Sequence, residues 1–242
     1  MRLFCLGLLC CVTLALGCED ETTPKPPSAS KNKILPLGAS RVEGGRPDFE
    51  SYRFELWKLL LTEDYEFDYI GTQTDRATYP GFADFPFDPD HEGRGGWTST
   101  EILDGLDDWL RETGPPDIVL FSSPGGNDIL GGGVDFPEIV ANINAIIDLL
   151  QTANPEVTII IEQLAPGMSA FMTAEFTDAF EQIQREVVTI AAQQTTATSR
   201  VLTIDMFTGF EDDLLADEVH YNEAGAKFIA DRYYTILQDF LE

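Results

Sequence analysis

An aspartate and a histidine stand three residues apart near the end of the chain, in the segment Asp217-Glu218-Val219-His220, and the chain contains only 2 histidines. On a single turn this spacing lets the carboxylate accept the Nδ1–H of the imidazole, which fixes the tautomer and leaves Nε2 free as a base. Such a base usually activates a nucleophile. The pair therefore predicts a nucleophile and a set of oxyanion donors elsewhere in the chain.

The candidate nucleophile is Ser40, which follows a short apolar segment in Gly38-Ala39-Ser40-Arg41-Val42. A serine after a glycine is also an ordinary turn residue, so the motif alone carries little weight. It does not fit the nucleophile elbow of α/β-hydrolases, because no glycine follows the serine at the required position.

Candidate oxyanion donors lie in two further segments. Asn127 follows an apolar run in Gly125-Gly126-Asn127, and Gly96 lies in a glycine-rich stretch where its backbone N–H would be free to donate. The N–H of Ser40 itself is a third donor. Each such donor contributes roughly 3 kcal/mol to lowering the barrier of acyl transfer. The alternative for Gly125-Gly126 is that the two glycines simply form a strand-to-helix turn.

The elements that must position these residues alternate along the chain. Buried strands are predicted over 33–37, 67–70, 117–121, 157–161 and 201–205, and helices over 52–61, 98–113, 136–152, 173–193 and 223–241. Strands that are continuous apolar runs and alternate with helices are typical of a parallel sheet covered on both faces. We therefore predict a three-layer α/β/α, flavodoxin-like fold with a five-stranded parallel sheet. Ligands bind at the carboxyl ends of such strands, which Ser40, Asn127 and His220 all follow.

Composition limits the classes of partner. The 242 residues include 15 Lys and Arg against 42 Asp and Glu, for a net charge of −27. Nucleic-acid binding is not expected, because the chain lacks the basic surface that would displace phosphate counterions. A hydrophobic content of 43% is ample for one packed domain. We expect a monomer.

The N-terminus indicates export. An apolar run follows Met1-Arg2 and predicts a signal peptide over 1–17. All 4 cysteines lie in or at the end of this run, so the rest of the chain has no thiol chemistry. The segment Ala15–Cys18 resembles a bacterial lipobox, which predicts lipidation of Cys18, a flexible linker over 18–32, a catalytic domain over 33–242 and a cell-envelope location. Ordinary secretion is the alternative.

A long loop is predicted over 72–98, and loops of this length are often functional. Its His91 is expected to make a structural hydrogen bond, the alternative being a contact with substrate. Calcium binding by Asp84, Asp88, Asp90 and Glu92 is not expected, because their spacing is not that of an EF-hand loop and prolines interrupt them. No metal is expected.

The same loop is rich in aromatic residues. They either form a platform for a sugar ring or pack the loop onto the sheet, and the sequence leaves both readings open. The residues are Tyr79, Phe82, Phe85, Phe87 and Trp97.

Four separated blocks, containing Ser40, Gly96, Asn127 and His220 in that order, resemble the SGNH hydrolases, also called the GDSL esterase/lipase family. Within it the chain looks most like the acetylxylan esterases of carbohydrate esterase family 3. The supporting segments are Leu35–Gly38, Ser51–Arg53, Asp90–Gly93 with Gly96–Thr98, and Asp217-x-x-His220-x-Asn222-x-x-Gly225. The resemblance implies that Ser40 is the nucleophile, His220 the base and Asp217 its orienting partner. It implies an oxyanion hole of Ser40, Gly96 and Asn127, and no cofactor.

The chain departs from the family pattern around the nucleophile. Ala39 replaces the usual Asp, Val42 replaces a usual Thr, Arg41 stands where an apolar residue is common, and Gly126 replaces a frequent Thr. The first two changes remove polar groups that would brace the nucleophile turn.

The expected function is a serine esterase that cleaves short-chain acetyl esters on carbohydrates. The expected partners are an acetylated carbohydrate or another small ester, with membrane contact only through the lipid anchor. The alternatives are another SGNH activity (arylesterase, thioesterase or lysophospholipase) and a catalytically weakened surface protein that binds glycans.

Overall fold

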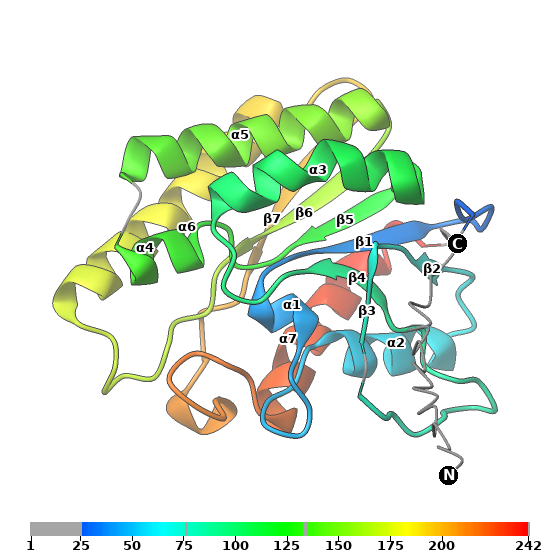
Figure 1. Cartoon of the computed structure of the whole chain (residues 1–242), viewed down its shortest axis with the longest axis horizontal. Helices are drawn as coiled ribbons and strands as arrows, with labels where there is room; N and C mark the ends of the chain where they lie inside the picture. Colours follow the sequence, from blue (N-terminus) through cyan, green and yellow to red (C-terminus); the bar gives the residue numbers. More distant parts are fainter. Residues whose placement is uncertain (1–25, 76, 133–134, 242) are drawn as a thin grey trace, which may run out of the picture.

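The computed structural model describes residues 26–75, 77–132 and 135–241. Figure 1 shows a central sheet with helices on both sides. The predicted signal peptide, Cys18 and the first part of the predicted linker lie outside the described residues. Within the described part of the chain, no helix is both long enough and apolar enough to span a membrane.

The sheet contains seven strands. They are β1 (Lys33–Gly38), β2 (Asp68–Tyr69), β3 (Gln73–Thr74), β4 (Asp90–Gly93), β5 (Ile118–Phe121), β6 (Thr158–Gln163) and β7 (Arg200–Asp205). Their order is β3-β4-β1-β5-β6-β7, with β2 also beside β1, and only β3 pairs antiparallel. The predicted fold class is confirmed. The five expected strands correspond to β1, β2, β5, β6 and β7, and the sheet has two more.

The two additional strands, β3 and β4, lie inside the segment predicted as one long loop. The sequence of β4, Asp90-His91-Glu92-Gly93, has no apolar residue, so it lacks the usual sign of a buried strand. Its side chains are nevertheless buried. Glu92 can be buried because its carboxylate accepts the Thr72 N–H at 2.9 Å and pairs with Arg94 at 2.8 Å.

His91, in the same strand, supports the structural interpretation. Its Nδ1 accepts the Gly93 N–H at 2.9 Å. Burial, together with the charges of Arg53 and Arg94, lowers the pKa of His91 to about 2. A buried neutral imidazole bonded within its own strand does not need a substrate partner.

Helices cover both faces of the sheet (Figure 1). They are α1 (Ser40–Glu43), α2 (Arg53–Thr62), α3 (Ser99–Thr113), α4 (Gly126–Gly131), α5 (Phe136–Ala153), α6 (Ala174–Gln194) and α7 (Glu223–Leu237), with a 3₁₀ turn at Asp212–Leu214. The expected capping box of α3 is present, since Thr98 and Glu101 accept each other's backbone N–H groups. The short helices α1 and α4 were not predicted.

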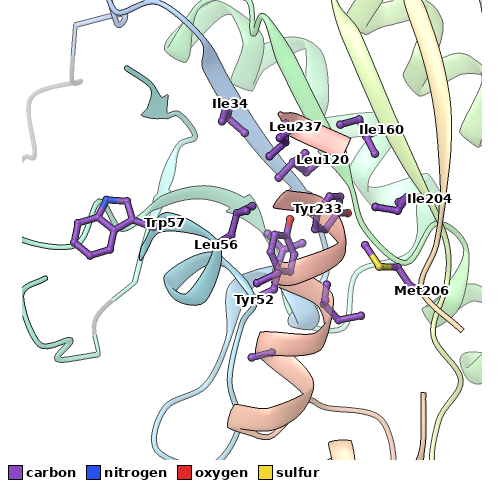
Figure 2. Close-up of a cluster of buried hydrophobic side chains, with 14 of the residues drawn as sticks. Ile34, Tyr52, Leu56, Trp57, Leu120, Ile160, Ile204, Met206, Tyr233 and Leu237 are labelled. Carbon is purple, nitrogen blue, oxygen red and sulfur yellow. The ribbon is translucent and has the colours of Figure 1, made fainter. Parts of the chain in front are cut away.

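Alternate strand residues point to opposite sides and form two cores. Ile34 and Leu120 belong to the core shared with α2 and α7, whereas Leu35 and Val119 belong to the core shared with α3, α5 and α6. Figure 2 shows the first core, in which the rings of Tyr52 and Tyr233 lie 4.8 Å apart. This contact matters for the site, because α2 closely follows Ser40 in the chain and α7 begins shortly after His220.

Candidate active site

The structure brings together Ser40, His220 and Asp217. The Ser40 Oγ lies 2.9 Å from His220 Nε2, and His220 Nδ1 lies 2.7 Å from Asp217 Oδ2. A carboxylate can only accept, so Nδ1 carries the proton and Nε2 is the free acceptor facing the hydroxyl. The geometry is that of a serine, a base and an orienting acid.

Asp217 is held as a carboxylate. Its second oxygen, Oδ1, accepts the N–H groups of Val219 at 2.9 Å and His220 at 2.8 Å. Partial burial opposes ionisation, but these hydrogen bonds and the one to the imidazole prevail and lower the pKa of Asp217. The His220 ring also stacks on Phe49, with ring centroids 4.0 Å apart. The stacking on Phe49 therefore fixes the plane of the imidazole, and the hydrogen bond to Asp217 fixes the direction of its Nδ1 edge.

The turn that carries Ser40, residues 39–43 (the nucleophile turn), is braced in part by side chains from outside it. The carbonyl of Val42 accepts the Ser51 hydroxyl and the Arg53 Nε, each at 2.7 Å. Arg53 is fully buried and also donates to the Glu43 carbonyl at 2.9 Å. The polar groups missing at Ala39 and Val42 are thus offset by hydrogen bonds to the backbone of the turn.

The three candidate oxyanion donors follow three neighbouring strands, β1, β4 and β5. Within the described residues, the N–H groups of Ser40 and Gly96 have no hydrogen-bond acceptor. The Asn127 amide donates one hydrogen to the Trp97 carbonyl at 2.8 Å, which leaves its second hydrogen available. Gly96 has φ +80°, a conformation that favours glycine.

These groups lie close to one another. Ser40 and Asn127 line the same cavity. A Cβ added at Gly95 would lie 3.9 Å from the Ser40 Cβ, so the loop that carries Gly96 passes beside Ser40.

The cavity next to Ser40 is small, at about 30 Å³. It is lined by Ala39, Ser40, Arg41, Ser123, Gly126, Asn127, Leu130, Leu164, Phe180 and Val219. This volume is the space open to the centre of a water-sized sphere, and one water needs roughly 10–15 Å³ of it. The cavity therefore holds a group about as large as two waters. Its apolar side is formed by Leu130, Leu164 and Phe180.

Comparison with known families agrees with this geometry. The model of the GDSL-like Lipase/Acylhydrolase family matches residues 66–228. The chain belongs to this family. The match includes Gly96, Asn127, Asp217 and His220 but begins after Ser40. No curated protein sequence matches the chain.

Solved structures similar to this GDSL-family chain include carbohydrate esterases. A carbohydrate esterase family 3 protein from Talaromyces cellulolyticus has a TM-score of 0.73 at 28% identity, over 86% of this chain and 96% of its own. An acetyl esterase mutant solved with an acetate ion gives the same values. A family 3 carbohydrate esterase from Clostridium thermocellum has a TM-score of 0.68 at 29% identity, over 86% and 95% of the two chains. This GDSL-family protein is a carboxylic ester hydrolase.

One residue of this GDSL site, Arg41, had no role predicted from the sequence. The side chain is 7% exposed, and it donates to the carbonyls of Val219 at 2.8 Å, Ala165 at 2.8 Å and Pro166 at 3.0 Å. It therefore ties the nucleophile turn to the His220 loop and to the segment after β6. Its only sequence signal is a cation directly after the serine.

In the acidic loop of this hydrolase, the carboxylate of Asp88 makes its hydrogen bonds within the protein. Asp88 accepts the N–H groups of Tyr69 at 2.8 Å and Asp90 at 3.3 Å. Among the described residues, no group of three or more His, Cys, Asp or Glu is placed to hold a metal ion.

The aromatic residues of the loop divide into two kinds. Tyr79 and Phe87 pack against Phe54, with ring centroids 4.9 and 5.2 Å away, so for these two the packing interpretation holds. Phe85 is 58% exposed, so the packing interpretation does not hold for this residue.

Proposed function

We propose that this hydrolase cleaves acetyl esters on carbohydrates through an acyl-enzyme on Ser40. The observation that carries the proposal is the 2.9 Å contact between Ser40 Oγ and His220 Nε2 beside a cavity of about 30 Å³. The contact supplies an activated hydroxyl, and the cavity admits an acetyl group but not a long acyl chain. The similarity to carbohydrate esterase family 3 proteins gives independent support.

The proposed reaction has two halves. Ser40 Oγ attacks the ester carbonyl as His220 Nε2 takes its proton, and Asp217 stabilises the imidazolium that forms. The oxyanion of the tetrahedral intermediate accepts hydrogen bonds from the Ser40 N–H, the Gly96 N–H and the Asn127 amide. His220 then protonates the leaving alcohol. Water, activated by the same base, attacks the acyl-enzyme and releases acetate.

The test is hydrolysis of p-nitrophenyl acetate by the purified protein and by Ser40→Ala and His220→Ala variants. Each substitution is expected to lower kcat by about a thousandfold or more, with far-UV circular dichroism unchanged. Ser28→Ala is the control, since Ser28 lies with Asp68 near the amino ends of β1 and β2, and it should keep full activity. Near-normal turnover by Ser40→Ala would overturn the proposal.

The carbohydrate part of the proposal needs its own measurement. Acetate release from acetylated xylo-oligosaccharides is compared with hydrolysis of aryl acetate, a thioester and a lysophospholipid. The proposal expects the highest kcat/KM on the acetylated sugar. Preference for one of the other esters would instead indicate an arylesterase, a thioesterase or a lysophospholipase.

We propose in addition that the protein is exported and anchored through an acylated Cys18. The apolar run over 3–17 and the polar spacer after Cys18 support this. Cys18→Ala is expected to move the protein from the detergent phase to the aqueous phase in Triton X-114 partitioning of expressing bacteria. Aqueous partitioning of the unaltered protein would favour plain secretion.

A further inference from the structure

Among the cavities at the carboxyl edge of the sheet in the described residues, two share a lining residue. The first is the space of about 30 Å³ beside Ser40, and the second is a much larger one of about 690 Å³. The larger cavity lies between the first half of α6, the segment after β6 and the segment over 207–212 that follows β7. Its volume is within the range of ligand-binding pockets.

One residue separates the two cavities. Among the described residues, Phe180 alone lines both, and its side chain is 4% exposed. Leu164 lines the small cavity, whereas its neighbour Gln163 lines the large one. Phe180 therefore stands where the space beside Ser40 ends and the larger space begins.

The segment after β6 contributes Leu164 to the small cavity and Pro166 and Gly167 to the large one, and its backbone is held in place. The Met168 N–H donates to the Glu218 carbonyl at 2.8 Å, and the Ser169 N–H donates to Asp212 Oδ1 at 2.8 Å. These bonds join the segment after β6 to the His220 loop on one side and to the 3₁₀ turn on the other. Because this segment is tied on both sides, we expect it to stay in place when a substitution removes the Phe180 ring.

The large cavity has apolar side chains in its lining. Met172 and Phe210 line it, as does Phe180, and Phe207 contributes another apolar side chain that is 36% exposed. An acyl chain longer than acetyl, attached to Ser40 and directed past Phe180, would meet these apolar side chains in a cavity that charged residues such as Glu181 and Arg185 also line.

We propose that Phe180 sets the acyl-chain specificity of this hydrolase by closing the acetyl pocket against the larger cavity. The inference rests on the proposed esterase function. In the native protein the ring ends the pocket after the acetyl methyl group. Shortening the side chain joins the two spaces and admits longer acyl groups to the same nucleophile.

The test compares p-nitrophenyl acetate, butyrate and octanoate as substrates of the unaltered protein and Phe180→Ala. Each buried methylene contributes about 0.8 kcal/mol, so the two methylenes added in butyrate convert to roughly a tenfold change in kcat/KM. The ratio of butyrate to acetate is expected to rise at least about tenfold in Phe180→Ala, and octanoate is expected to become a substrate. Met172→Ala is the matched control, since Met172 lines the large cavity but not the small one, so its truncation should leave the ratio unchanged.

The outcomes separate the two proposals. If the unaltered protein does not cleave acetate at Ser40, the proposed function fails and this inference fails with it. If acetate is cleaved but the butyrate ratio of Phe180→Ala stays within twofold of the original, only the role of Phe180 is overturned. Phe180→Val keeps more of the packing, so it preserves the test if Phe180→Ala does not fold, and an intermediate ratio is expected from it.

Discussion

Removal of the Arg41 guanidinium is expected to cost both stability and turnover. In Arg41→Met the side chain keeps its approximate length but loses its donors, which leaves the carbonyls of Ala165, Pro166 and Val219 without their partner. An unsatisfied buried carbonyl costs about 1–3 kcal/mol. The hydrogen bond to the Ala165 carbonyl is buried, so the loss of that bond carries the full cost. The bonds to Pro166 and Val219 are partly buried, so the loss of each carries a smaller cost. The sum is about 3 kcal/mol.

This loss of stability is measurable. For a domain of this size, 1 kcal/mol shifts Tm by about 2–4 °C, so Arg41→Met is expected to unfold about 6–12 °C lower. Arg41→Lys can restore one of the three hydrogen bonds, so its Tm should lie between those of Arg41→Met and the unaltered protein. Arg111→Met is the control, because Arg111 is 66% exposed and pairs only with its own helix at Asp107 and Asp108. Its surface ion pairs contribute little, and its Tm should stay within about 2 °C.

The kinetic effect follows from the position of Val219, which directly precedes His220. A displacement of about 1 Å at a reacting group costs roughly a hundredfold. Arg41→Met is therefore expected to lower kcat on p-nitrophenyl acetate by about 10- to 100-fold with KM changed much less, measured well below its Tm. Unchanged Tm and kcat would refute this reasoning. A lower Tm with full kcat would show that Arg41 stabilises the fold without positioning the base.

Two further predictions concern carboxylates. Asp217→Asn should reduce kcat less than His220→Ala, because the base and the oxyanion donors survive; the reverse order in the same assay would contradict the proposed roles. Burial raises the pKa of Asp88 from 3.8 to about 6, although it accepts two backbone N–H groups. The folded state therefore binds this proton more tightly, and stability falls as pH rises from about 4 to 6. The free energy of unfolding of Asp88→Asn minus that of the unaltered protein, measured by urea unfolding, should therefore be about 2 kcal/mol larger at pH 7.5 than at pH 4.5. The same difference at both pH values would refute the assignment.

The strands predicted well were those whose residues are apolar on both faces. β5 is buried throughout, and β6 is buried between its two half-buried end residues, so pattern alone locates them. β4 was missed because its burial depends on partners distant in sequence, such as Thr72 for Glu92. A short strand of polar residues has no periodic signal until those partners are known.

The same distinction applies to the site. Asp217 and His220 are close in sequence, so their spacing predicts their contact. The geometry of Arg41 could not be predicted, because its acceptors are backbone carbonyls and every residue has one. The structure places the predicted catalytic and oxyanion residues, Ser40, Gly96, Asn127, Asp217 and His220, at one edge of the sheet.

The bond between Ser40 and His220 joins positions 180 residues apart in the chain. During synthesis Ser40 is therefore made well before its proposed base, and α7, which packs against α2, is made after that base. A nascent chain or a fragment that stops before His220 carries the serine but not the proposed base. Under the proposed mechanism, ester hydrolysis therefore requires synthesis beyond His220, and an activity assay doubles as a test that these two distant segments have come together.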